Sequence, residues 1–140
     1  MSEHRDPLAE HPAARPLTAE GFASLHASAK ATAIVTFDDG RFLDANSAFA
    51  ELSGFERSDL LDHDVFDMGL FADVRHHVAL LRELEECGEV RAWGTRLRRR
   101  DGILRNILLS AQLLDVAGRR AILTWIRDVT EITGGAGLPA

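Results

Sequence analysis

The stretch AIVTFDDGRFLDANSAFAELSG, residues 33–54, decides the fold of this chain. Residues 33–37 and 41–45 are two runs of strand character, and the Asp-Gly pair between them favours a tight turn that requires positive φ. The stretch therefore predicts a β-hairpin. Asn46 is suited to cap the short helix that follows, and Gly54 is suited to end that helix in the left-handed conformation.

The longest predicted helix lies downstream of the hairpin, at residues 71–87. Four apolar residues recur there at helical spacing and are expected to form one buried stripe: Val74, Val78, Leu81 and Leu84. Charged residues occupy the positions between them, so the opposite side of this helix is expected to face solvent.

Three further strands are expected at residues 90–100, 104–115 and 119–129, joined by short turns. Consecutive hairpins make these strands antiparallel neighbours, and the first hairpin is expected to join them edge-on. The middle strand is apolar on both faces, as expected of a central strand that is covered on each side. The predicted fold is therefore α+β: a five-stranded antiparallel sheet with helices on one face and an N-terminal leader helix.

The chain divides into four segments. Residues 1–17 hold three prolines and no periodicity, which predicts a flexible arm, and the glycine-rich residues 134–140 predict a flexible tail. Between them we expect a leader helix at residues 18–29 and a single globular domain at residues 30–133.

Composition excludes several classes of protein. A chain of 140 residues with 46% hydrophobic and 27% charged residues is one ordinary folded domain with tails. The net charge of −6 opposes binding to nucleic acid or to an anionic membrane. One cysteine excludes an internal disulfide framework and a cysteine-rich zinc site. No apolar run approaches the ~20 residues of a membrane span, and no signal sequence is visible, so we expect a cytoplasmic protein.

Four motifs stand in the order and at the spacing of a known family: DGRFLDANSAF at residues 39–49, LSGF with DLL within residues 52–61, RRRDG at residues 98–102, and RDVTE at residues 127–131. They resemble the motifs of the PAS domain, S-box type, of bacterial signal-transduction proteins such as sensor histidine kinases and diguanylate cyclases. The glycine that usually follows the second motif is Asp62 here. The fourth motif usually leads to a signalling helix and an output domain, so we expect a fragment of a longer receptor; a free-standing protein is the alternative.

The resemblance implies a sensory or protein-interaction module without enzymatic activity. Such a module passes a signal to an output domain or partner protein by a shift in the sheet or its flanking helices. The resemblance places Asp128 and Thr130 at the exit of the terminal strand, where they would anchor signal transmission. No phosphate-cradling glycine loop, metalloprotease motif or nucleophile motif is present in the sequence, in agreement with a module that is not an enzyme.

A bound cofactor is the alternative that the resemblance leaves open, because haem-binding relatives ligate iron through a histidine on the long helix. His77 stands at a similar position and is the candidate haem ligand, although a histidine beside an apolar stripe is usually structural. The arginine that usually accompanies haem is not clearly placed. Flavin photochemistry needs a cysteine within residues 62–69, where there is none, and Cys87 is too distant. We therefore expect no haem, flavin or metal, and a small-molecule ligand is the alternative that is left open.

Two charged clusters carry weaker signals. The arginines of residues 91–105 are expected to be solvated or to form salt bridges in a protein contact, rather than to bind phosphate. The acidic residues within residues 59–67 lack the glycine and terminal glutamate of a calcium loop, so we interpret them as turn and helix-start residues.

Partner binding is predicted from the two apolar faces of the middle strand. Leu108 and Leu114 lie on one face and Ile107 and Leu109 on the other, and only one face can pack against the helices. The resemblance implies that these helices enclose a ligand cavity. The bare face would expose a larger apolar patch than soluble monomers usually tolerate. The leader helix, residues 18–29, is expected to cover it and to form a homodimer with a second copy. A ligand-free dimerisation adaptor is a further alternative.

Overall fold

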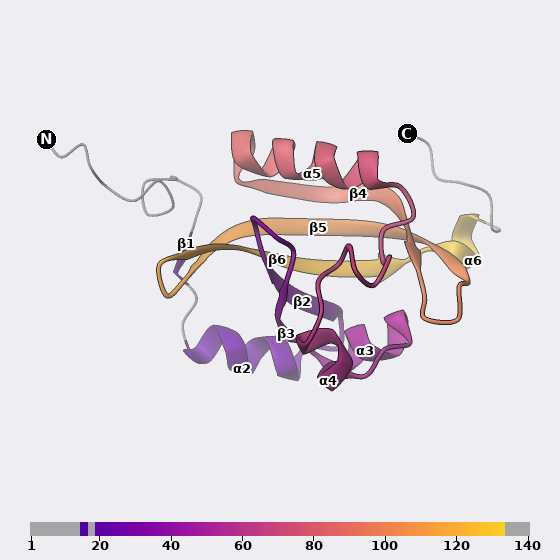
Figure 1. Cartoon of the computed structure of the whole chain (residues 1–140), viewed down its shortest axis with the longest axis horizontal. Helices are drawn as coiled ribbons and strands as arrows, with labels where there is room; N and C mark the ends of the chain where they lie inside the picture. Colours follow the sequence, from indigo (N-terminus) through magenta and orange to yellow (C-terminus); the bar gives the residue numbers. More distant parts are fainter. Residues whose placement is uncertain (1–14, 17–18, 134–140) are drawn as a thin grey trace, which may run out of the picture.

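The structure is a computed structural model that describes residues 15–16 and 19–133. Its elements in chain order are labelled in Figure 1 and have these bounds: β1 (Arg15–Pro16), α2 (Ala19–Ala27), β2 (Ala31–Thr36), β3 (Phe42–Ala45), α3 (Ser47–Ser53), α4 (Arg57–Leu61), α5 (Val74–Cys87), β4 (Glu89–Arg98), β5 (Leu104–Val116), β6 (Arg119–Asp128) and α6 (Thr130–Thr133). No helix in these described residues is long and apolar enough to cross a membrane.

The sheet has the predicted antiparallel arrangement. Five strands lie in the order β4-β5-β6-β2-β3, so the first hairpin joins the other three strands through β2 and β6. The two-residue β1 adds a parallel pairing beside Leu114 and Asp115 of β5, although it lies in the segment predicted as a flexible arm. The other residues of that arm, and the predicted tail 134–140, lie outside the described residues.

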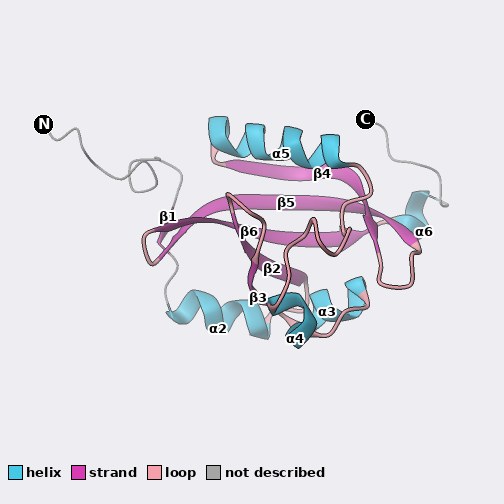
Figure 2. Ribbon diagram, in the orientation of Figure 1, coloured by secondary structure: helices cyan, strands magenta, loops and turns pink. Residues whose placement is uncertain are grey.

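Helices pack on both faces of the sheet, which leaves two separate apolar clusters. The larger cluster holds side chains of α3, α4 and α5 against the inner face of the sheet, which includes Ile107 and Leu109 of β5. Figure 2 shows α5 along β4, and α3 and α4 near β3. The smaller cluster lies on the opposite, outer face, where Leu25 of α2 packs against Ile34 and Leu114. The leader helix thus covers part of the outer face within a single chain.

The long helix differs from the prediction in both its start and its buried side. It begins at Val74 rather than residue 71, because the side chain of Asp73 accepts a hydrogen bond from the backbone N–H of Arg75 and caps it. Val74 and Val78 are 56% and 50% exposed, so the predicted stripe is wrong at these two positions. The buried side runs instead through His77, Leu80 and Leu84, spaced i, i+3 and i+7.

Candidate functional site

A small cavity lies between the inner face of the sheet and helices α3 and α5. Its volume is about 30 Å³, and its lining is apolar apart from His77 and Thr124. Phe42 ends the turn of the first hairpin and Phe49 sits one turn into α3, and these two rings meet edge to face with centroids 5.7 Å apart. Two aromatic rings and the strands therefore form one wall of the cavity.

His77 is the polar residue that α5 brings to this cavity, and it is only 4% exposed. Its imidazole lies between two rings, edge to face with Phe66 at 4.8 Å and tilted against Phe71 at 4.6 Å between centroids. Burial lowers the pKa of His77 below its ordinary value, so the ring is neutral near pH 7. Its buried Nδ1 has no hydrogen-bond partner among the described residues.

The cavity does not fit a haem or a flavin. A volume of about 30 Å³ has room for roughly two water-sized groups, since one water needs about 10–15 Å³. Arg96 pairs with Asn106 of β5 and is exposed, so it does not line the cavity. Cys87 is exposed at the end of α5, where a hydrogen bond to Glu83 raises the pKa of the thiol. No three acidic, histidine or cysteine residues in the described part of the chain gather as a metal site.

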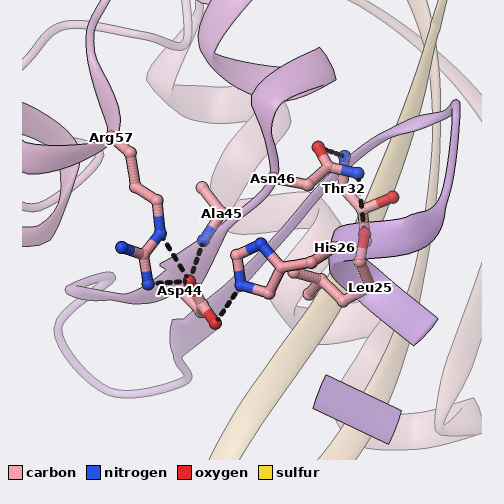
Figure 3. A network of polar contacts seen from close by, with 7 residues as sticks. All are labelled: Leu25, His26, Thr32, Asp44, Ala45, Asn46 and Arg57. Atoms are coloured by element: carbon pink, nitrogen blue, oxygen red, sulfur yellow. Dashed lines mark hydrogen bonds and ion pairs between the residues drawn. The ribbon is translucent and has the colours of Figure 1, made fainter. Parts of the chain in front are cut away.

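Asp44, at the end of β3, is the centre of a polar network that sequence reasoning missed (Figure 3). Its Oδ1 accepts hydrogen bonds from Nε and Nη2 of Arg57 at 3.0 and 2.8 Å, and its Oδ2 lies 2.8 Å from Nε2 of His26. Burial alone would raise the pKa of this carboxyl, but the hydrogen bonds from Arg57 and His26 outweigh burial and lower it. Asp44 therefore ties α2 to α4 as an ionised carboxylate.

Asn46 performs the predicted capping of α3 and also joins three elements. Its side-chain oxygen accepts hydrogen bonds from the backbone N–H groups of Phe49 at 2.9 Å and Thr32 at 3.0 Å. The two hydrogens of its amide nitrogen are shared among the carbonyls of Leu25 at 2.9 Å, Ser28 at 3.3 Å and Lys30 at 2.7 Å. A residue with no exposed surface thus fixes the end of α2, the start of β2 and the start of α3 together.

Asp128 and Thr130 lie together at the end of β6, and neither lines the cavity. Asp128 accepts a hydrogen bond from Nε of Arg105 at 2.6 Å and one from the backbone N–H of Thr130 at 2.9 Å. The Thr130 hydroxyl in turn accepts from the backbone N–H of Asn106 at 2.8 Å. Burial would raise the pKa of Asp128, but the Thr130 and Arg105 hydrogen bonds lower it. These contacts fasten the chain to β5 where it leaves the sheet.

The two charged clusters of the sequence do not converge on a binding site. Arg91, Arg99 and Arg105 each lie within 4 Å of a carboxylate of this same chain, so the predicted contact with another protein stays a prediction. In the acidic cluster, Asp64 accepts hydrogen bonds from the backbone N–H groups of Phe66 and Asp67, as expected of a turn residue.

The outer face of the sheet has two hollows that share Trp125 of β6. One lies between α2 and the sheet, beside Leu25 and Leu123. The other lies beside β4, over Ser110 and Gln112 of β5. Trp125 is partly buried, so it offers an aromatic surface that α2 does not cover completely.

Comparison with known proteins places residues 30–131 in a family model described as the PAS domain. A PAS domain from Colwellia psychrerythraea has a TM-score of 0.69 at 17% identity, over 80% of this chain and 96% of that one. A PAS domain of a two-component sensor histidine kinase has a TM-score of 0.63 at 21% identity, over 76% of this chain and 90% of that one. A domain of a sensory box sensor histidine kinase/response regulator from Geobacter sulfurreducens has a TM-score of 0.60 at 25% identity, over 76% of this chain and 90% of that one. No curated protein matches the chain.

Proposed function

The chain belongs to the PAS domain family, and on this premise we propose that it is a sensory and protein-interaction module of bacterial signal transduction. Domains of sensor histidine kinases are among its structural neighbours, which supports the signalling role. In the proposed mechanism the cavity receives the signal, and α2 and the end of β6 pass it to an output domain or a partner. The proposal places the module in the cytoplasm.

The observation that carries this proposal is the polar link between the cavity wall and the leader helix. Phe49 of α3 lines the cavity, and α3 is capped by Asn46, whose side chain also holds the last turn of α2. Arg57 at the start of α4 and His26 on α2 share the carboxylate of Asp44. A displacement of α3 or α4 must therefore either move α2 or break these bonds.

A second route leads out of the sheet through Asp128 and Thr130. Asp128 pairs with Ile107 in the sheet register, and Ile107 belongs to the inner cluster that surrounds the cavity. The carboxylate of Asp128 orients the first turn of α6 because it accepts a hydrogen bond from the backbone N–H of Thr130. In the proposal these two residues anchor the exit and transmit a shift of β6 to whatever follows.

The proposed partner in the first instance is a second copy of the chain, bound through α2 and the outer face of the sheet. Leu25 of α2 covers Ile34 and Leu114, but Trp125 and Leu123 stay only partly buried beside it. A helix of nine residues covers little of a five-stranded sheet, and two copies related by a two-fold axis would bury more of this face.

The proposal includes neither catalytic turnover nor a haem or flavin cofactor. The one buried imidazole of the cavity, His77, faces the rings of Phe66 and Phe71. The remaining polar group of the lining is the hydroxyl of Thr124, which offers no acid–base set. A cavity of about 30 Å³ supports this part of the proposal, because it is far smaller than a macrocycle or a flavin.

The test is the mass of the full chain in solution, measured by light scattering. We expect a dimer that is lost, or replaced by aggregates, when residues 1–29 are deleted. The variant Trp125→Glu places a charge on the outer face and should give a folded monomer. Val78→Glu is the matched control, because Val78 is 50% exposed on α5, away from the outer face, and should leave the dimer intact. A stable monomer before and after the deletion would show that the proposed interface does not exist.

A further inference from the structure

The buried Nδ1 of His77 is an anomaly that the fold itself does not explain. Buried polar atoms in proteins nearly always have a hydrogen-bond partner, because an unpaired one loses its bond to water without replacement. This nitrogen belongs to a side chain more than nine-tenths buried, on the wall of a cavity, and none of the described residues pairs with it. A group inside the cavity would supply the missing bond.

The lining fixes the chemistry of that group. Apart from His77 and Thr124 the wall consists of aliphatic and aromatic side chains such as Phe42, Phe49 and Leu97. A charged ligand would have to lose its hydration there with no opposite charge to pair with, because the imidazole is neutral. A lone water would find at most two polar partners, and buried waters make about three hydrogen bonds. The favoured occupant is neutral and mostly apolar.

The volume of the cavity limits the size of the molecule that can bind. A cavity of about 30 Å³ admits a molecule of roughly two to four non-hydrogen atoms with small adjustments of the lining side chains. Such a molecule can carry one hydrogen-bonding group. A hydroxyl suits both tautomers of a neutral imidazole, because it donates to a bare Nδ1 and accepts from a protonated one.

From this geometry we infer that the cavity binds a small neutral molecule whose single hydroxyl pairs with Nδ1 of His77, while its alkyl part packs on Phe42, Phe49 and Leu97. This inference rests on the proposed function, in which the cavity receives the signal, and it names the chemical class of that signal. Ligands of so few atoms bind weakly, and the expected Kd is about millimolar.

The experiment uses the full chain, with 1-propanol as the hydroxyl-bearing probe and xenon as an apolar filler without a hydroxyl. In NMR titrations, 1-propanol should give saturable shifts at the rings of Phe42 and Phe49. His77→Leu should weaken 1-propanol about tenfold and leave xenon binding unchanged, and His77→Gln, which keeps a polar side chain, should recover part of the loss. Contacts between the propanol methyl group and the His77 ring, measured by nuclear Overhauser effects in the unmodified chain, need no variant to fold.

Two results would overturn the inference: shifts that grow linearly with 1-propanol without saturating, or equal affinity in the unmodified chain and His77→Leu. Its failure is distinct from that of the proposed function. A chain that loses its dimer through Trp125→Glu but ignores 1-propanol keeps the proposed function and discards the ligand class. A chain that binds 1-propanol but whose mass never depends on α2 keeps the ligand and discards the interface.

Discussion

The structure predicts that Asn46→Ala lowers the free energy of unfolding by more than the loss of a helix cap alone would. As an N-cap alone, the asparagine is worth about 1 kcal/mol of folding free energy. In the structure the side-chain oxygen of Asn46 also accepts a hydrogen bond from the backbone N–H of Thr32, a buried residue. Leaving a buried donor without a partner costs about 1–3 kcal/mol. The expected loss of unfolding free energy is therefore about 2–4 kcal/mol.

Two of the three carbonyls that accept hydrogen bonds from Asn46 should add little to this loss of unfolding free energy. The carbonyl of Leu25 keeps a bond from the backbone N–H of Ser28, and that of Lys30 keeps one from the hydroxyl of Thr32. Loss of the hydrogen bonds from Asn46 to these carbonyls should instead give faster hydrogen exchange of the backbone amides of α2.

Urea denaturation followed by circular dichroism measures the loss of stability. Asp73→Ala is the matched control, because Asp73 also caps a helix, α5, but through one backbone N–H at an exposed site. It should cost clearly less than Asn46→Ala. Equal losses for the two variants would show that Asn46 acts as an ordinary cap and that its link to β2 and α2 carries no free energy.

Two more predictions follow from the burial of His77 and from the backbone at Gly40. The pKa of His77 is lowered by burial, so the unfolded chain, with the ordinary value of 6.5, binds a proton more readily than the folded one. Stability should be fully present above pH 6.5 and fall as the pH drops below it, and denaturation midpoints of His77→Leu should lack this part of the slope. Gly40→Ala should lower the melting temperature more than Gly102→Ala: both sites have positive φ, but a Cβ at Gly40 would lie 2.8 Å from Cγ2 of the buried Val65, while nothing lies within 4 Å of one at Gly102. Equal melting temperatures for these two variants would contradict that reading of the packing.

The sheet could be predicted from the sequence because its signals are local. The Asp-Gly turn after β2 and the alternation of Ile107, Leu108 and Leu109 in β5 depend on neighbours along the chain, and the structure keeps both. The buried side of α5 is harder to predict, because helical spacing fits Leu81 as well as Leu80 and because a histidine carries no apolar signal. A neutral histidine between two aromatic rings packs as an apolar side chain does, so His77 displaces Val74 and Val78 from the buried side.

The polar network could not be predicted in the same way. Asp44 meets Arg57 and His26 across sequence separations of 13 and 18 residues, and no spacing rule connects them. The capping of α3 by Asn46 was visible because it spans three residues, whereas its bonds to the carbonyls of α2 depend on where that helix comes to lie. Local polar patterns reveal caps and turns, and long-range ones need the fold.

A ligand in the cavity can move α2 only if its binding free energy is comparable to that of the hydrogen bonds that must break. A ligand at about ten times its Kd shifts a conformational equilibrium by at most about 1.4 kcal/mol. That is comparable to one hydrogen bond in a protein and much less than the set of bonds made by Asn46. The contact within reach is the one between His26 and Asp44, because the His26 side chain is 42% exposed and water can replace it, while Arg57 still neutralises the carboxylate. A weak ligand would therefore release α2 at His26, and the end of the helix held by Asn46 would serve as the pivot.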